Sequence, residues 1–451
     1  MNKKSIRIGG GAGYSEDLLR PALDLIERGN LDYIIFECLA ERTIALAQLQ
    51  KLSDPNKGYN SKLEYRMRKV LPLAYKQGTK VITNMGAANV PKAVELTAKI
   101  ARELGLSGIK IAGVLGDDIF EDIDKYSNHP MMETGQPLSK LSKELVSANV
   151  YLGFEGIVEA LNNGADIVIT GRCADAALVA GPIMHHFNWQ GYERLGIATA
   201  AGHLMECGGY LTGGYFANPV QSNVPQFWDI GYPICEIMED GEIYLSKLEG
   251  TGGRLDRATC TEQLLYEIGD PANYLTPYCV ADFSQVNFEE CKESYVKVTG
   301  ATGKPPTGTY KVSIGYKDSY IGVSEFSYGG LGCFERCNWA FELAQKRWEL
   351  LGLKAEETRF DIIGYNSIVD GPNLPKPCPK TLTDLRARIA IRTDDQAVAQ
   401  EMLEESTAGL SVHAAGSGLM TISVKPVVAV ISILIPASVP HVSVIYKEVQ
   451  P

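Results

Sequence analysis

Short apolar runs and amphipathic stretches alternate along the first half of the chain. Runs such as DYIIFEC, KVITN and ADIVIT are apolar over most of their length, which is typical of strands that are buried on both faces. The stretches between them, such as PKAVELTAKIARELG, repeat apolar residues at helical spacing. Because strands alternate with helices, we predict an α/β fold with a doubly wound, mostly parallel sheet.

The pattern changes after the glycine- and proline-rich segment VTGATGKPPTGTY, near residue 305. YKVSIGYKDSYIGVSEFSYGG predicts two strands around a turn, and FERCNWAFELAQKRWELLG predicts a helix. Further on, MTISV and VVAVISILI predict two separate strands. We therefore predict two domains: an α/β core over residues 1–305 and a smaller α+β domain over residues 306–451.

Composition narrows the class of protein. The net charge is −11, which argues against a nucleic-acid binder with a basic face. The apolar run VVAVISILI is about half of what spans a bilayer, and the start MNKKSIRIGG lacks the apolar segment of a secretory signal. The ten cysteines show no disulfide spacing, which favours a reducing compartment. We expect a cytoplasmic protein that binds neither nucleic acid nor membranes.

The stretch IRIGGGAGYSED raises the question of a nucleotide-binding loop. A dinucleotide fingerprint needs a glycine at the sixth loop position, which is Tyr14 counted from Gly9 and Glu16 counted from Gly11. A phosphate-binding P-loop is absent as well, because no glycine precedes Lys and Ser or Thr at the required spacing. Two interpretations stay open: a tight turn with close packing, or a loop whose amides near Gly10 and Gly11 bind an anion.

Polar residues follow directly after four of the predicted strands, in ECLAERT, TNMGAAN, GVLGDD and TGRCAD. In open parallel sheets, ligands bind beyond the carboxyl ends of the strands, so these side chains are expected to line one cleft. Taken singly, each could instead cap the next helix. The two arginines could bind a carboxylate or phosphate through two hydrogen bonds. The predicted cleft residues are Glu37, Glu41, Arg42, Asn84, Asp117, Asp118, Arg172 and Asp175.

A second group of candidate residues lies in HLMECGG, where His203 and Glu206 are three positions apart. On a helix this spacing places both on one face, which suits an acid–base couple or two metal ligands. A metal site needs a third ligand, and none can be located, so we assign no metal. A packed histidine satisfied by its neighbour is the alternative. The cofactor is unknown.

Several motifs together resemble the acyclic terpene utilisation (AtuA-like) family. IGGGAGYSED, ECLAERT, TGRCADAALVAGP, HLMECGGYLTGGYF, EGTGGRLDRATCTEQLLYEIGDPANYLTP and TYKVSIGY occur in this order, from about Ile6 past Tyr316. The family was long catalogued as a domain of unknown function without agreed catalytic residues. The resemblance implies catabolism of branched acyl-CoA thioesters, as in geraniol and citronellol degradation. It also implies a ferredoxin-fold domain or small partner protein, although this chain ends at Pro451 without obvious room for an appended domain.

We therefore expect a hydratase, dehydratase or lyase that acts on a branched acyl-CoA or small carboxylic acid by proton abstraction next to a carbonyl. The alternative is a non-catalytic binding or scaffold subunit that becomes active only with a small ferredoxin-fold partner. We also expect a homo-oligomer. The predicted catalytic residues are Glu37, Glu41, Asp175, His203 and Glu206. The predicted substrate-binding residues are Gly10, Gly11, Arg42, Asn84, Asp117 and Arg172.

Overall fold

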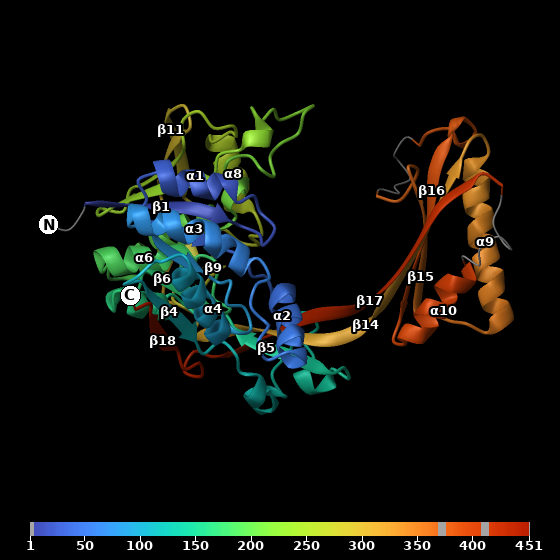
Figure 1. Ribbon diagram of the computed structural model, residues 1–451, viewed down its shortest axis with the longest axis horizontal. Coiled ribbons are helices and arrows are strands. Elements are labelled where there is room, and N and C mark those ends of the chain that lie inside the picture. Colours follow the sequence, from blue (N-terminus) through green and yellow to red (C-terminus); the bar gives the residue numbers. More distant parts are fainter. Residues whose placement is uncertain (1–3, 369–375, 407–414, 451) are drawn as a thin grey trace. The chain divides into compact units, whose positions relative to one another are not determined.

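The computed structural model describes residues 4–368, 376–406 and 415–450. These residues form two compact units (Figure 1). The first unit contains residues up to Ser142, then Val146–Gly315, and then the chain from Val430 onward. The second contains Lys143–Leu145 and Tyr316–Ala429. The division into domains over residues 1–305 and 306–451 stays a prediction. In the structure, the chain from Val430 onward packs with the first unit.

The first unit is built on a ten-stranded mixed sheet with the order β11-β12-β8-β7-β1-β2-β3-β6-β4-β18. The five central strands run parallel to one another: β1 (Ser5–Ala12), β2 (Tyr33–Phe36), β3 (Lys80–Thr83), β6 (Ile167–Thr170) and β4 (Lys110–Leu115). Antiparallel strands extend both sides: β7 (Pro233–Met238), β8 (Ile243–Lys247), β12 (Tyr295–Thr299), β11 (Asn287–Lys292) and β18 (Ser443–Glu448). The α/β class is thereby confirmed with a mixed sheet, and the doubly wound arrangement stays a prediction.

Burial explains why the central strands read as continuous apolar runs. All four residues of β2 are buried, as expected for a strand covered on both faces. The helices form two groups of neighbours, α1 with α3 and α4, and α5 with α6 and α7. Helix α1 buries Ala22, Leu25 and Ile26, which recur at helical spacing. The helix bounds are α1 (Arg20–Arg28), α2 (Glu41–Ser53), α3 (Leu63–Gln77), α4 (Val90–Glu103), α5 (Glu155–Asn162), α6 (Ala177–Phe187), α7 (Tyr192–Glu206) and α8 (Arg257–Leu265).

Smaller elements complete the first unit. A three-stranded sheet has the order β13-β10-β9 and consists of β13 (Thr302–Lys304), β10 (Val280–Asp282) and β9 (Tyr274–Leu275). The short 3₁₀ helices of this unit are η1 (Phe120–Tyr126), η2 (Leu138–Lys140), η3 (Gly208–Tyr210) and η4 (Phe227–Asp229).

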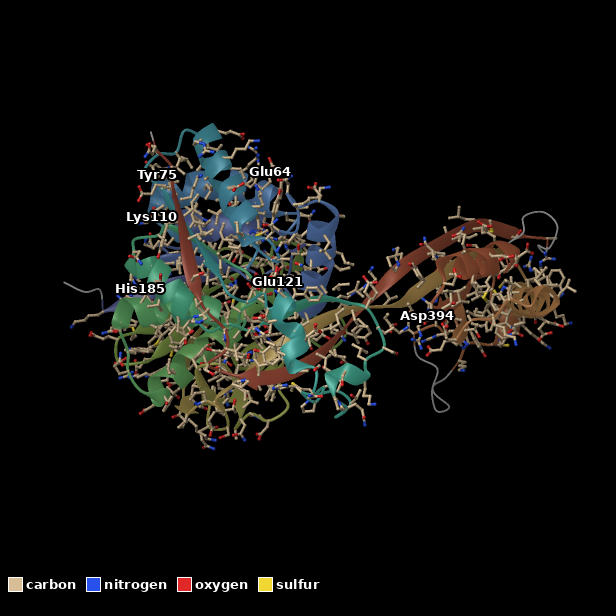
Figure 2. The ribbon with its side chains drawn as sticks, turned by 90° about the horizontal axis from the view of Figure 1, so that it is seen from below. Glu64, Tyr75, Lys110, Glu121, His185 and Asp394 are labelled. Atoms are coloured by element: carbon tan, nitrogen blue, oxygen red, sulfur yellow. The ribbon has the colours of Figure 1, made fainter. Side chains whose placement is uncertain are left out.

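The second unit follows a β-α-β-β-α-β path. Its sheet has the order β15-β16-β14-β17. It is formed by β15 (Glu357–Ile363), β16 (Asp384–Thr393) and those parts of β14 (Thr309–Gly329) and β17 (Ser417–Pro436) that fall within residues 316–429. The helices are α9 (Cys333–Leu351) and α10 (Gln396–Ser406), with the 3₁₀ helix η5 (Pro379–Thr381). This is the ferredoxin-like split βαβ topology, so the expectation that the chain has no room for such a fold is wrong. Within this unit Lys143 forms an ion pair with Asp394, which is labelled in Figure 2.

Two further predictions for this region are wrong. YKVSIGYKDSYIGVSEFSYGG forms one strand, β14, and not two strands around a turn. β14 pairs with β5 (Leu145–Val150), and its residues 320–329 pair with β16. Pairing with two different strands keeps the backbone extended through the polar residues that were expected to form the turn. MTISV and VVAVISILI likewise belong to one strand, β17, which continues through Pro426. Since β17 stands at the end of the sheet order, the missing N–H of this proline is tolerated.

Candidate active site

Two neighbouring cavities in the first unit open where the central strands end. Cavity A, about 260 Å³, is lined by the loop after β1, the segment after β2, the turn after β6, the end of α7 and the residues after α8. Cavity B, about 430 Å³, is lined by Tyr151, Lys311 and residues 267–270 and 273–277, among others. Glu41, Asp175 and Glu267 line both cavities. A row of carboxyl groups therefore separates two spaces of ligand size.

Glu37 follows β2 directly and is held in place by two donors. The Asn84 side-chain amide donates to Glu37 Oε1 at 2.6 Å, and the Leu39 N–H donates to the same oxygen at 3.0 Å. Asn84 is itself fixed, because its Oδ1 accepts from the Cys38 N–H at 2.8 Å. Glu37 lines cavity A, whereas Asn84 is fully buried behind it. Asn84 is thus placed to orient Glu37 and does not line either cavity.

Arg172 reaches cavity A from the turn after β6, but its hydrogen bonds go to the protein. Nε donates to the Cys173 carbonyl at 3.0 Å, and the other two nitrogens donate to the Leu39 carbonyl and to Asp175. The guanidinium also lies 4.3 Å from the centroid of the Tyr151 ring. The side chain is 1% exposed. Arg172 is therefore tied into the wall, which does not favour the predicted two-point binding of a substrate anion.

Asp175 and Glu37 form a pair of carboxyl groups with a shared electrostatic environment. Burial raises the pKa of both groups, the Asp175 charge raises the pKa of Glu37 further, and Arg172 opposes the rise at both. The charges of Glu206 and Glu41 add to the rise at Asp175. A single guanidinium among several carboxyl groups cannot keep all of them ionised. Glu37 and Asp175 therefore keep protons at pH values above those at which carboxyl groups usually ionise.

The pKa of Glu41, in the first turn of α2, is lowered and not raised. Burial would raise its pKa, but a hydrogen bond from the Tyr151 hydroxyl and the charges of Arg172 and Lys311 lower it to about 2. Lys311 of β14 lies 3.2 Å from Glu41 and 4.8 Å from the centroid of the Tyr151 ring. Glu41 is therefore ionised beside a wall that retains protons.

The His203–Glu206 couple lies at the end of α7. His203 Nδ1 is 2.9 Å from Glu206 Oε1, and Nε2 is 3.1 Å from the Leu264 carbonyl oxygen. Burial lowers the pKa of His203, but the hydrogen bond and charge of Glu206 raise it overall. Glu206 lines cavity A, whereas His203 is 1% exposed and lines neither cavity. The structure thus places Glu206 at the site and His203 behind it.

The glycine-rich opening forms a strand where a loop was expected. Gly10 and Gly11 lie inside β1, and a Cβ on Gly11 would come within 2.6 Å of the Phe36 ring. At Gly13, which begins the loop, a Cβ would come within 2.3 Å of the Cys207 backbone. The Gly13 N–H donates to Asp17 Oδ2 at 2.7 Å. Close packing is therefore the interpretation that the geometry supports, and the free amide needed to bind an anion is already used at Gly13.

The remaining strand-end residues have structural contacts. Asp117 is buried, and its Oδ2 accepts from the Arg172 N–H at 2.9 Å and from Asn149 at 3.0 Å. Burial raises the pKa of Asp117 to about 6. Asp118 Oδ1 accepts from the Phe120 N–H at 3.1 Å, just before η1. Arg42 is exposed on α2. These three residues line neither cavity.

Several wall residues were missed by the sequence analysis. Tyr14, Tyr210 and Tyr266 line cavity A, and the Tyr210 and Tyr266 rings meet edge to face at 5.6 Å. Glu267 follows α8, and Lys311 comes from β14. The segment YEIGDPANYLTP holds Tyr266 and Glu267, but no strand end marks it as a site. His185, which lies on α6 and is labelled in Figure 2, lines neither cavity; its Nδ1 is 2.6 Å from Asn162 Oδ1.

The described residues offer neither a cluster of metal ligands nor a helix that could cross a membrane. Over residues 4–368, 376–406 and 415–450, no group of three or more His, Cys, Asp or Glu side chains is arranged to hold a metal ion. Within the same ranges, no helix has the length and apolar character that crossing a bilayer would require.

Comparison with known proteins gives one match. The family model described as "Acyclic terpene utilisation family protein AtuA" matches residues 6–446. No curated protein and no solved structure matches the chain.

Proposed function

The chain belongs to the acyclic terpene utilisation AtuA family, and on that premise we propose that it is a hydratase, dehydratase or lyase that moves a proton next to a carbonyl group. The observation that carries the proposal is the contrast among three carboxyl groups of one wall. Glu37 and Asp175 have raised pKa values, whereas the pKa of Glu41 is lowered to about 2. Carboxyl groups whose pKa values are pushed apart are the usual arrangement of a catalytic acid and base.

Each carboxyl group then has a role that follows from its environment. Glu37 and Asp175 exchange a proton with the substrate near neutral pH, because an acid or base works best when its pKa lies near the working pH. Glu41 stays ionised, and with Arg172 and Lys311 it sets the charge around the exchanging pair. Asn84 positions Glu37 through its 2.6 Å hydrogen bond.

The wall also favours one of the predicted substrate classes. A free carboxylate in cavity A would face several carboxyl groups and an arginine whose nitrogens already donate to the protein. A thioester carries no charge at its reacting carbonyl and avoids this repulsion. Cavity B offers apolar side chains such as Ile268, Leu275 and Leu434 for a branched chain. We therefore propose a branched acyl-CoA thioester rather than a free acid.

The test is turnover of branched enoyl-CoA and 3-hydroxyacyl-CoA thioesters and of small hydroxy acids by the purified chain, followed by chromatography. Glu37→Gln and Asp175→Asn are expected to lower kcat by about 10²- to 10⁴-fold, the typical contribution of general acid–base catalysis. Glu193→Gln, an exposed change on α7, is the matched control. Full activity in Glu37→Gln would contradict the proposal. Turnover that appears only after a small ferredoxin-fold protein is added would favour the alternative of a partner-dependent subunit.

A further inference from the structure

One oxygen of Glu206 lacks a hydrogen-bond partner. Oε1 is engaged by His203, but Oε2 has no partner among the residues that the structure describes. The side chain is 9% exposed and belongs to the wall of cavity A. A buried carboxylate oxygen without a donor is costly, so a ligand that brings a donor to this oxygen gains affinity.

His203 fixes which kind of group Glu206 can bind. The Leu264 carbonyl oxygen only accepts, so His203 Nε2 must donate to it. A proton on Nδ1 as well lets the ring donate to Glu206 Oε1. In that arrangement Glu206 is a carboxylate and its free Oε2 is an acceptor. The complementary ligand atom is therefore a donor.

Carboxyl groups also dominate the rest of cavity A. Its wall carries six carboxyl side chains, those of Asp17, Glu37, Glu41, Asp175, Glu206 and Glu267. The backbone donors of Gly13 and Leu39 are used by Asp17 and Glu37. Each nitrogen of Arg172 donates to a protein acceptor. A ligand anion would find little compensation here.

The tyrosine rings at this wall suit an organic ligand. Tyr14 is 63% exposed, and Tyr210 stacks on Tyr215 with centroids 5.0 Å apart. Ring faces and edges of this kind pack against carbon–hydrogen groups, while their hydroxyls remain available for hydrogen bonds.

We propose that cavity A binds the hydroxyl-bearing, uncharged end of its ligand, with the hydroxyl group donating to Glu206 Oε2. His203 is a positioning residue that orients Glu206 through the contact between Nδ1 and Oε1. The inference rests on the proposed function and adds to it the chemical nature of the substrate's reacting end. An alkylammonium group is a second source of donors, which the experiment separates from a hydroxyl group.

The test is calorimetric titration of the full chain with four probes: the N-acetylcysteamine thioesters of 3-hydroxybutyrate and butyrate, free butyrate, and butylammonium. The hydroxylated thioester is expected to bind about tenfold or more tightly than the butyryl thioester, as for a hydrogen bond to a charged group. Equal binding of the two thioesters, tighter binding of butyrate or butylammonium, or no binding of any probe would overturn the inference.

Substitutions test whether Glu206 and His203 produce the preference for the hydroxylated thioester. Glu206→Gln is expected to remove the preference for the hydroxylated thioester, whereas Glu193→Gln on the same helix keeps it. His203→Leu should lose the preference, and His203→Gln, which can still donate to Glu206, should retain part of it. Unchanged preference in Glu206→Gln or His203→Leu would refute the assigned roles, with thermal unfolding used to confirm that each variant is folded. Binding needs no turnover, so a retained preference without turnover of any thioester would contradict the proposed function alone.

Discussion

Each unit of the molecule contains a pairing of aspartate with arginine in which at least one partner is buried, and the two pairings have opposite consequences. In the second unit, Asp361 accepts from Arg359 at 2.9 Å and from Arg388 at 2.6 Å. Burial would raise its pKa, but the two arginines lower it overall. In the first unit, Asp175 is paired with Arg172, and yet its pKa is raised.

The difference lies in the number of charges that share the pair. Asp361 has two arginines to itself, so its negative charge is fully compensated. Arg172 is shared by Asp175, Glu37 and Glu41, and its charge does not suffice to keep the pKa values of Asp175 and Glu37 from rising. The first arrangement holds strands together, and the second stores an exchangeable proton. An ion pair alone therefore does not distinguish a structural site from a reactive one. An excess of carboxyl groups over arginines does.

The largest effect is expected from removal of the shared cation. Arg172→Met leaves the Leu39 and Cys173 carbonyls without their donor and the carboxyl groups without compensation. We expect the free energy of unfolding to fall by about 3–5 kcal/mol, as when one partner of a buried ion pair is removed. Urea unfolding measures this. Arg42→Met, at an exposed position, is the control and should change stability by about 0.5 kcal/mol or less. A small loss in Arg172→Met would mean that the guanidinium is free to bind ligands.

A smaller effect is expected at Asp117, which has no arginine side chain as a partner. Its folded pKa of about 6 lies above the ordinary 3.8, so the folded protein binds this proton more tightly than the unfolded chain does. The free energy of unfolding should therefore fall as the pH rises from about 4 to 6, by up to about 3 kcal/mol from this group. Asp117→Asn should remove that part of the slope in urea titrations at several pH values, and the exposed change Glu193→Gln should leave it. The same slope in wild type and Asp117→Asn would contradict the assignment.

The smallest effect tests the comparison directly. Asp361→Asn is expected to lower the free energy of unfolding at pH 7 by about 1.5–3 kcal/mol, because charged hydrogen bonds to two arginines are lost. The contribution of Asp361 is present at neutral pH and is lost as the pH falls through its lowered pKa. Asp175→Asn should change stability at pH 7 by about 0.5 kcal/mol or less, since a neutral group there resembles the protonated acid. Equal losses of stability in the two variants would contradict the proposed difference between Asp361 and Asp175.

Strand-end reasoning predicted from the sequence that several polar residues would line one cavity. Glu37, Glu41, Arg172 and Asp175 all line cavity A, as predicted from their positions after apolar runs. Arg42 was predicted to line the same cleft but lines neither cavity. Adjacent side chains on helix α2 point in different directions, so Glu41 lines the cavities and Arg42 does not.

Other contributions depend on which distant elements meet, and no local pattern reports that. Tyr151 and Lys311 lie far apart in the chain and meet at Glu41. Gly10 and Gly11 were expected in a loop, but β1 continues to Ala12 and uses them for packing. In the fold, the parallel centre was predictable from buried apolar runs. The antiparallel strands β7, β8, β11, β12 and β18 were not, because pairing partners are chosen by tertiary structure.

The pairing of β18 with β4 has a consequence for synthesis on the ribosome. Ser443 pairs with Leu115 and Glu448 with Lys110, so one edge of the central sheet is completed by residues made after most of the chain. Until then β4 presents unpaired backbone groups, and an open edge is a template for pairing with other chains. Nascent chains stalled before residue 443 are therefore exposed to misassembly, and chaperone demand during translation follows from this strand order.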